Sequence, residues 1–201
     1  MKKTFVTLTI IIFATLISLA QEKIIIKETF ENNKFQWDEF YEKTCSSSIE
    51  NGYLKLSNND KDKKAITVVD LPINGDRNFK VKFYITSKVN SDFWFGIVYD
   101  YEDENNYSCF LVQEKRYKIV NVDKGISSIS RKGGIILKAG REQSVEFFVE
   151  KRGTKLIFNV DNMEVVSISK KIDLTTFGCY VEGNNSIKVT GVEIEQISEE
   201  D

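Results

Sequence analysis

The chain of 201 residues contains no histidine. This absence excludes the Ser-His-Asp triad, the Cys-His nucleophile pair and histidine-ligated zinc. No P-loop, dinucleotide-binding glycine motif or G-x-S-x-G nucleophile motif stands in a suitable context either. Carboxylate chemistry and binding are therefore the functions that the sequence leaves to consider.

Proline is nearly absent as well, since Pro72 is the single one, and there is no linker rich in serine, glycine or proline. No charge block or repeat of fixed period divides the chain, so we predict one domain over residues 21–201. The 28 Lys and Arg residues are dispersed among 30 Asp and Glu residues, and none form a basic stripe interleaved with aromatics. Nucleic acid is therefore not an expected partner.

Residues 1–20 have the order of a secretory signal peptide. Lys2 and Lys3 provide a basic start, residues 5–17 are mainly apolar, and small residues precede Gln21. The apolar run is shorter than the roughly 20 residues that a spanning helix needs, and charged residues follow it at once. No cysteine follows the predicted cleavage point to carry a lipid. We expect a periplasmic or secreted protein without membrane insertion after leader cleavage; a retained N-terminal anchor is the alternative.

Cysteine is scarce and odd in number, with Cys45, Cys109 and Cys179. An oxidising compartment allows one disulfide and one free thiol, and the spacings do not choose the pair. Cys109 and Cys179 sit in apolar, strand-like runs, where a free cysteine is most often a small buried hydrophobe. We prefer packing over a disulfide.

Apolar residues recur with a period of two. Phe79, Val81, Phe83 and Ile85 alternate with polar residues, which is typical of a half-buried antiparallel strand. Sustained helical spacing is missing outside the leader, so helix content should be minor. Turn residues at short intervals predict an all-β sandwich or barrel.

Three segments are expected to form a meander of strands, 143–151, 154–160 and 163–169, joined by turns at Arg152-Gly153 and Asp161-Asn162. The last strand changes phase, because its apolar residues are odd-numbered at Ile187 and Val189 but even-numbered at Val192 and Ile194. We predict a β-bulge near Thr190-Gly191 that returns both pairs to the core side.

Residues 95–120 are the most specific part of the sequence. They read Phe95-Gly96-Ile97-Val98-Tyr99, Asp103-Glu104-Asn105-Asn106-Tyr107, Phe110-Leu111-Val112 and Tyr117-Lys118-Ile119. This succession resembles the concanavalin A-like lectin/glucanase superfamily, in the laminin-G-like form of exported bacterial proteins. The opening Glu28-Thr29-Phe30 with Trp37, the hairpin Phe158 to Asn162, and Phe177-Gly178 with Val192 to Ile194 are similar to other parts of such domains. The resemblance implies a two-sheet antiparallel jelly roll that binds carbohydrate or protein, or in a minority of members cleaves glycosides.

The acidic residues after the strand at 93–100 have three interpretations. Asp100, Glu102 and Glu104 have the alternate spacing of paired glycosidase acids, but the E-x-D-x-x-E pattern of the glucanase branch is not met. Asp100, Asp103, Glu104 and Asn105 supply oxygen ligands for a calcium-binding loop, although the spacing fits no EF-hand. A solvated acidic turn is the preferred interpretation, and no other cofactor is expected.

Strand alternation also suggests a ligand-binding face. Phe93, Phe95, Ile97 and Tyr99 share one side of their strand, so Trp94 points to the other side with Asp100. By the same reasoning Tyr84 and Tyr107 point away from the core. If their strands are neighbours, Tyr84, Trp94, Asp100 and Tyr107 line one open face suited to sugars. The alternative is that a loop covers Trp94 as part of the core.

Three functions follow from these features. The first is an exported, non-catalytic module that binds a glycan or a cell-envelope protein through the face carrying Trp94, and the absent catalytic motifs favour it. The second is a glycoside hydrolase-like enzyme that uses Asp100 or Glu102. The third is a structural envelope protein without a small ligand, for which a flat sheet face is expected.

Overall fold

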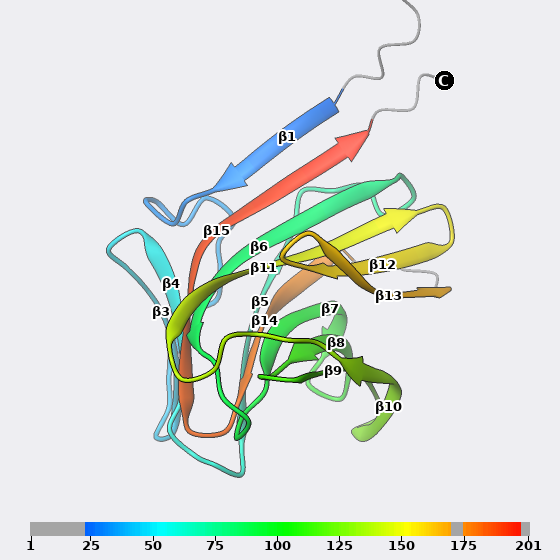
Figure 1. The fold of residues 1–201 in the computed structure, drawn as a ribbon. Helices are drawn as coiled ribbons and strands as arrows, with labels where there is room; N and C mark the ends of the chain where they lie inside the picture. The colour runs from blue at the N-terminus through cyan, green and yellow to red at the C-terminus, as the bar shows by residue number, and fades with distance from the viewer. Residues whose placement is uncertain (1–22, 170–174, 198–201) are drawn as a thin grey trace, which may run out of the picture.

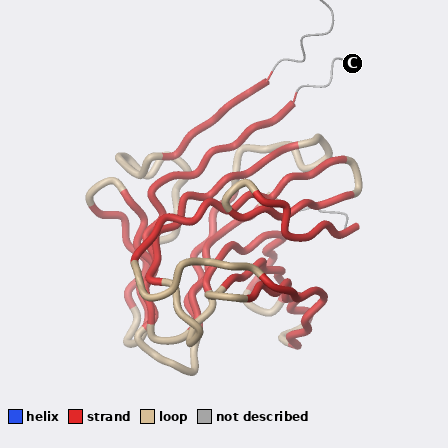
Figure 2. Tube along the Cα trace, in the orientation of Figure 1, coloured by secondary structure: helices blue, strands red, loops and turns tan. Residues whose placement is uncertain are grey.

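The computed structural model describes residues 23–169 and 175–197. Strands, turns and loops make up this part of the chain, and no helix occurs among its residues (Figures 1 and 2). Within the described ranges no helix is long and apolar enough to cross a membrane. The predicted signal peptide, residues 1–20, lies outside the described residues.

The larger sheet has nine antiparallel strands. In spatial order these are β13 (Met163–Ser169), β12 (Lys155–Val160), β11 (Glu142–Arg152), β6 (Phe79–Lys88), β15 (Asn185–Ile197), β4 (Tyr53–Asn58), β3 (Cys45–Glu50) and β2 (Phe40–Tyr41), and β1 (Lys23–Glu28) also pairs with β15.

The smaller sheet has six antiparallel strands. Their spatial order is β10 (Ile126–Gly134), β9 (Arg116–Asp123), β8 (Asn106–Val112), β7 (Phe95–Asp103), β14 (Thr176–Glu182) and β5 (Lys64–Asp70). The chain therefore crosses between the sheets at several points, including between β6 and β7. The expected two-sheet jelly-roll sandwich is confirmed.

The predicted turns and the bulge are confirmed in detail. β11, β12 and β13 form the expected meander, and the turn residues Asp161 and Asn162 have positive φ angles of 49° and 65°, as a type I′ hairpin turn requires. In β15 the register with β6 shifts between Val189 and Gly191. Before this bulge β15 pairs with β4, and after it β15 pairs with β1 (Figure 1), so the bulge also marks a change of neighbour.

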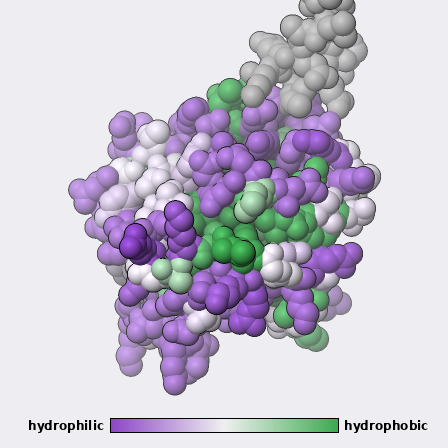
Figure 3. Space-filling model, viewed as in Figure 1, coloured by the Kyte–Doolittle hydropathy of each residue, from purple (hydrophilic) through white to green (hydrophobic). Residues whose placement is uncertain are grey.

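The core lies between the two sheets and is rich in aromatic side chains. The Phe110 ring lies 5.1 Å from Phe158 and 6.1 Å from Phe147, centroid to centroid, which joins the smaller sheet to the larger one. The alternate residues Phe79, Val81, Phe83 and Ile85 of β6 are all buried in this core, as predicted. Outside the core, much of the surface seen in Figure 3 is hydrophilic, with an apolar area near the centre of that view.

A buried carboxylate holds the loop that follows β1. Glu28 is 2% exposed, and its two carboxylate oxygens accept hydrogen bonds from the backbone N–H groups of Phe30 and Phe35, each at 2.8 Å. The loop in turn places Phe30 and Trp37 in the core, where their ring centroids are 5.8 Å apart. The opening residues of the domain are therefore fixed by one side chain.

We expect Glu28→Gln to lower the free energy of unfolding by about 1–3 kcal/mol, because an amide nitrogen then faces a buried N–H donor. Urea titration measures this value. Glu31→Gln is the matched control, since Glu31 is exposed and its substitution should change stability by less than about 0.5 kcal/mol. Equal midpoints for the two variants contradict this role of Glu28.

Candidate functional site

The outer face of the six-stranded sheet carries a second apolar cluster, separate from the core. Along β7, Phe95, Ile97 and Tyr99 point into the core, while Val98 points outward. Trp94, directly before β7, packs against the outer cluster and is half-buried. The predicted division of residues 93–100 between two faces is thus confirmed, and Trp94 is not part of the core.

Most members of this outer cluster are shielded from water although they lie outside the sandwich. The buried members are Val98, Tyr107, Cys109, Leu111, Val120, Val122 and Tyr180, and Ile66, Trp94 and Tyr101 pack against them. Apolar side chains that remain partly exposed are candidates for a binding site, and in this cluster they are Ile66, Trp94 and Tyr101.

Long cationic side chains lie over the aromatic rings of this face. Lys64 Nζ donates a hydrogen bond to the Tyr107 hydroxyl and lies 4.7 Å from the centre of its ring. Lys118 Nζ lies 4.2 Å from the Trp94 ring centre, and the Arg116 guanidinium carbon lies 5.8 Å from it. These are cation–π distances, so cationic groups contact the aromatic residues on this face of the sheet.

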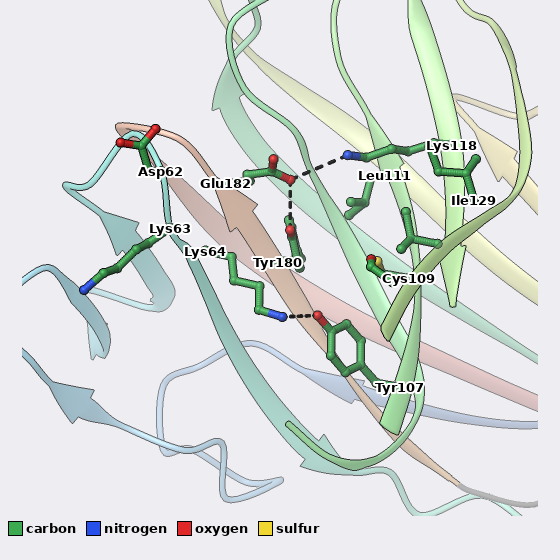
Figure 4. A pocket seen from close by; sticks show the side chains of 12 residues that line it. Asp62, Lys63, Lys64, Tyr107, Cys109, Leu111, Lys118, Ile129, Tyr180 and Glu182 are labelled. Carbon is green, nitrogen blue, oxygen red and sulfur yellow. Dashed lines mark hydrogen bonds and ion pairs between the residues drawn. The ribbon is translucent and has the colours of Figure 1, made fainter. Parts of the chain in front are cut away.

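Three adjoining hollows form a groove across this face. The central hollow has a volume of about 750 Å³, and its lining includes Lys64, Tyr107, Lys118, Tyr180 and Glu182 (Figure 4). It shares Lys118 with a hollow of about 570 Å³ that contains Trp94, which we call the tryptophan hollow. It shares Tyr107 with a hollow of about 410 Å³, which we call the acidic hollow.

Glu182 organises one side of the central hollow. Its Oε2 atom accepts a hydrogen bond from the Tyr180 hydroxyl at 2.9 Å and lies 3.6 Å from Lys118 Nζ. Figure 4 shows these three side chains meeting on the side of the hollow away from the Lys64–Tyr107 pair. The two tyrosine hydroxyls are thus positioned by charged partners from β5 and β14.

The acidic hollow presents hydrogen-bond acceptors. It is lined by Asp100, Glu102 and Asp123 together with polar and apolar side chains, Asn106, Tyr107, Ser108, Asn121 and Val122. Asp100 has a φ angle of 54° and stands where the pairing of β7 with β8 shifts register. In this irregular part of β7, the Tyr101 ring lies 6.0 Å from the Tyr107 ring. The bulge therefore places carboxylates and an aromatic pair at one end of the groove.

Three of the four predicted site residues, Trp94, Asp100 and Tyr107, line this groove. The prediction that Tyr84 joins them on one face is wrong, because β6 belongs to the nine-stranded sheet and β7 and β8 to the other. Tyr84 lies near Lys82 on the outer side of its own sheet, with Lys82 Nζ 5.4 Å from its ring centre. The error came from treating consecutive strands as neighbours.

The acidic turn between β7 and β8 is held by its own hydrogen bonds. Asp103 Oδ1 accepts from Asn105 N at 2.7 Å, and both Asp103 oxygens accept from Asn106 Nδ2. These bonds lower the pKa of the Asp103 carboxyl. In residues 23–169 and 175–197, no three or more Asp, Glu, Cys or His side chains converge on a possible metal position. The predicted ligands Asp100, Asp103, Glu104 and Asn105 thus show no ready-made calcium cage, and calcium binding stays a prediction.

Sequence reasoning missed Lys64, Lys118, Tyr180 and Glu182. Alternation along β14 does give a signal, since Phe177, Cys179 and Val181 are core residues and Tyr180 therefore points outward. The sequence does not reveal that β14 lies between β7 and β5. That placement, which brings distant parts of the chain together, creates the central hollow.

The sequence matches no protein-family model and no curated protein. Solved structures do match. A carbohydrate-binding module, CBM66, from Bacillus subtilis aligns over 77% of this chain and 94% of its own, with a TM-score of 0.58 and 14% identity. The exoplasmic/lumenal domain of VIP36, in a Ca²⁺- and mannose-bound form, aligns over 82% and 84%, with a TM-score of 0.57 and 10% identity. The β-glucanase of Bacillus licheniformis aligns over 87% and 98%, with a TM-score of 0.56 and 9% identity.

The chain has the concanavalin A-like fold. The resemblance seen in the sequence is thereby confirmed at the level of architecture. Identities of 9–14% show the fold alone, so the use of the groove has to be argued from its own side chains.

The three cysteines of this concanavalin A-like domain are free, as expected from their packing. Cys109 lies under the central hollow, 1% exposed, and burial raises the pKa of its thiol to about 12 although Lys118 and Lys64 oppose the shift. Cys179 is buried in the core, and burial raises its pKa as well. Cys45 is half-buried near the surface and donates to Glu42 Oε2 at 3.2 Å.

We expect an aromatic disulfide reagent at pH 8 to label one thiol of the folded protein, Cys45, because reaction requires an accessible thiolate. Labelling in denaturant should give three thiols. The count is made by absorbance, with Cys45→Ser as the control that abolishes labelling of the folded protein. A total of one thiol in denaturant indicates a disulfide and contradicts the structure.

Proposed function

We propose that this chain is an exported, non-catalytic module that binds carbohydrate through the groove on its six-stranded sheet. The observation that carries the proposal is a row of adjoining hollows on one sheet face, each lined by at least one aromatic side chain, with a cluster of carboxylates in the hollow at one end. A sugar ring has apolar C–H faces and a rim of hydroxyls, so it is bound by aromatic surfaces beside well-placed hydrogen-bonding groups.

Each part of the groove suits part of a sugar. Half-buried Trp94 offers apolar surface to a sugar ring in the tryptophan hollow. Tyr107 and Tyr180 line the central hollow, where their rings are buried and their hydroxyls are hydrogen-bonding groups. Asp100, Glu102 and Asp123 accept hydroxyl hydrogens in the acidic hollow. The carbohydrate-binding module and the mannose-bound domain among the similar structures support this reading. A cell-envelope protein is the alternative partner.

Export is part of the proposal. The support is the order of residues 1–20, which is that of a signal peptide. A periplasmic or secreted location also suits a protein whose ligand is a polysaccharide outside the cytoplasm. Fractionation of cells that make the full chain, with mass spectrometry of the N-terminus, tests both the location and the cleavage after Ala20.

A glycan array followed by calorimetry on the best ligand tests the site. We expect Trp94→Ala to weaken binding at least tenfold, or about 1.4 kcal/mol, because it removes the aromatic surface of the tryptophan hollow. Tyr84→Ala is the matched aromatic control, since Tyr84 belongs to the other sheet. Glu102→Ala should weaken binding less than Trp94→Ala, because Asp100 and Asp123 remain as acceptors in the acidic hollow. Unchanged affinity in Trp94→Ala removes Trp94 from the site.

Calcium dependence is tested on the same array. The predicted calcium ligands are the oxygen-bearing side chains of one loop, Asp100, Asp103, Glu104 and Asn105. Binding that needs calcium and is lost in Asp103→Asn supports that site. Binding that is unchanged by a chelator assigns these residues to the turn and the acidic hollow alone.

A glycoside hydrolase is the second candidate function, because Asp100, Glu102 and Asp123 line one hollow and paired carboxylates are the machinery of glycoside cleavage. Turnover of an array ligand, followed by mass spectrometry of the products, tests it. We expect the unsubstituted protein to cleave the ligand no faster than the Glu102→Gln variant does. Cleavage that Glu102→Gln or Asp100→Asn abolishes makes the protein an enzyme.

A further inference from the structure

The groove is unevenly charged along its length. Its central and tryptophan hollows are lined by five cationic side chains and two carboxylates, an excess of three positive charges, in a chain whose net charge is −2. The cations are Lys63, Lys64, Arg116, Lys118 and Lys132, and the carboxylates are Asp62 and Glu182. The acidic hollow at the other end has three carboxylates.

Most of these cations are not neutralised by the protein. Two of them form ion pairs: Lys118 Nζ lies 3.6 Å from Glu182 Oε2, and Lys63 Nζ lies 3.9 Å from Asp60 Oδ2. Lys64, Arg116 and Lys132 form no ion pair with a carboxylate of the described residues. Lys64 is instead held by the Tyr107 hydroxyl and ring. Its ammonium group is therefore positioned over the central hollow without an anionic partner.

Several cations line the same hollows. Lys118 and Arg116 both contact the Trp94 ring, at 4.2 Å and 5.8 Å, and Lys64 and Lys118 line opposite sides of the central hollow from β5 and β9. An excess of like charges along one groove is a source of repulsion. An anion bound among them relieves that repulsion and makes charge-assisted hydrogen bonds, which are stronger than neutral ones.

We propose that the ligand is an anionic glycan whose carboxylate or sulfate group binds between Lys64 and Lys118, with Arg116 beside it. This inference rests on the proposed carbohydrate-binding function and adds the class of sugar. The carboxylates of the acidic hollow repel an anion, so the charged sugar unit lies away from that end, near Lys118, which the central and tryptophan hollows share. Neutral hydroxyl-bearing units extend towards Asp100 and Glu102.

The test is an array that contains neutral, uronate-bearing and sulfated glycans, probed with the protein that remains after removal of residues 1–20. A chelator is present so that calcium does not bridge the carboxylates of the protein and those of the glycan. We expect the strongest ligands to be anionic, and their affinity to fall as sodium chloride rises from 50 to 500 mM. Strong binding of uronates identifies a carboxylate as the group recognised, and strong binding of sulfated glycans alone identifies a sulfate.

Variants then locate the anion. Lys64→Met and Lys118→Met should each weaken binding of the best anionic ligand at least tenfold, whereas Lys64→Arg should restore most of it because the charge is kept. Lys88→Met is the matched control, an exposed lysine at the end of β6 in the other sheet. Thermal unfolding of every variant confirms that each is folded. For a uronate ligand, methyl esterification of its carboxyls should have the effect of the lysine substitutions.

Three results overturn parts of the argument separately. If neutral glycans bind as tightly as anionic ones and the lysine variants bind normally, the anionic inference is wrong while carbohydrate binding stands. If no glycan binds either in the chelator or with calcium added, the proposed function itself fails, and the inference with it. Binding that requires Trp94 but not Lys64 or Lys118 also overturns the inference alone.

Discussion

The six-stranded sheet is apolar on both of its faces, and the proposed activity depends on that constraint. One face is buried against the nine-stranded sheet through rings such as Phe95, Phe110 and Phe177. The other is built from Val98, Cys109, Leu111 and their neighbours and is shielded by side chains of the same face. A sheet that faces water on one side normally alternates apolar and polar residues. Here the outward positions in the middle of β8 are apolar too, which makes this side a surface suited to contact another molecule.

Cationic side chains contact the aromatic residues of this face. Lys64 donates a hydrogen bond to the Tyr107 hydroxyl, and Lys118 Nζ lies 4.2 Å from the centre of the Trp94 ring. The same two lysines are those that we propose bind the anionic group of the ligand. In this proposal, contact with the rings and selection by charge depend on the same side chains.

Strand alternation and turn chemistry allowed most of the fold to be predicted. The period of two in β6, the I′ turn at Asp161-Asn162 and the phase change before Val192 are local signals, and each is confirmed. The order of strands within a sheet is not local. In this sandwich some consecutive strands belong to different sheets, because connections such as that between β6 and β7 cross from one sheet to the other. Tyr84 was misplaced for this reason, and Tyr180 was missed because β14 joins β7 and β5 from more than 70 positions along the chain.

The groove holds its charges differently from the core. Glu28 and Lys151 are both buried, and each is satisfied by backbone groups, Glu28 by two N–H donors and Lys151 by the carbonyls of Asp76 and Arg77. Lys64 has a neutral tyrosine hydroxyl as its hydrogen-bond partner, at the rim of a hollow. Its register partner in β14 is Glu182, whose carboxylate contacts Tyr180 and Lys118. The Lys64 ammonium group therefore keeps the capacity to bind an anion from outside, which is the physical basis of the proposed selectivity.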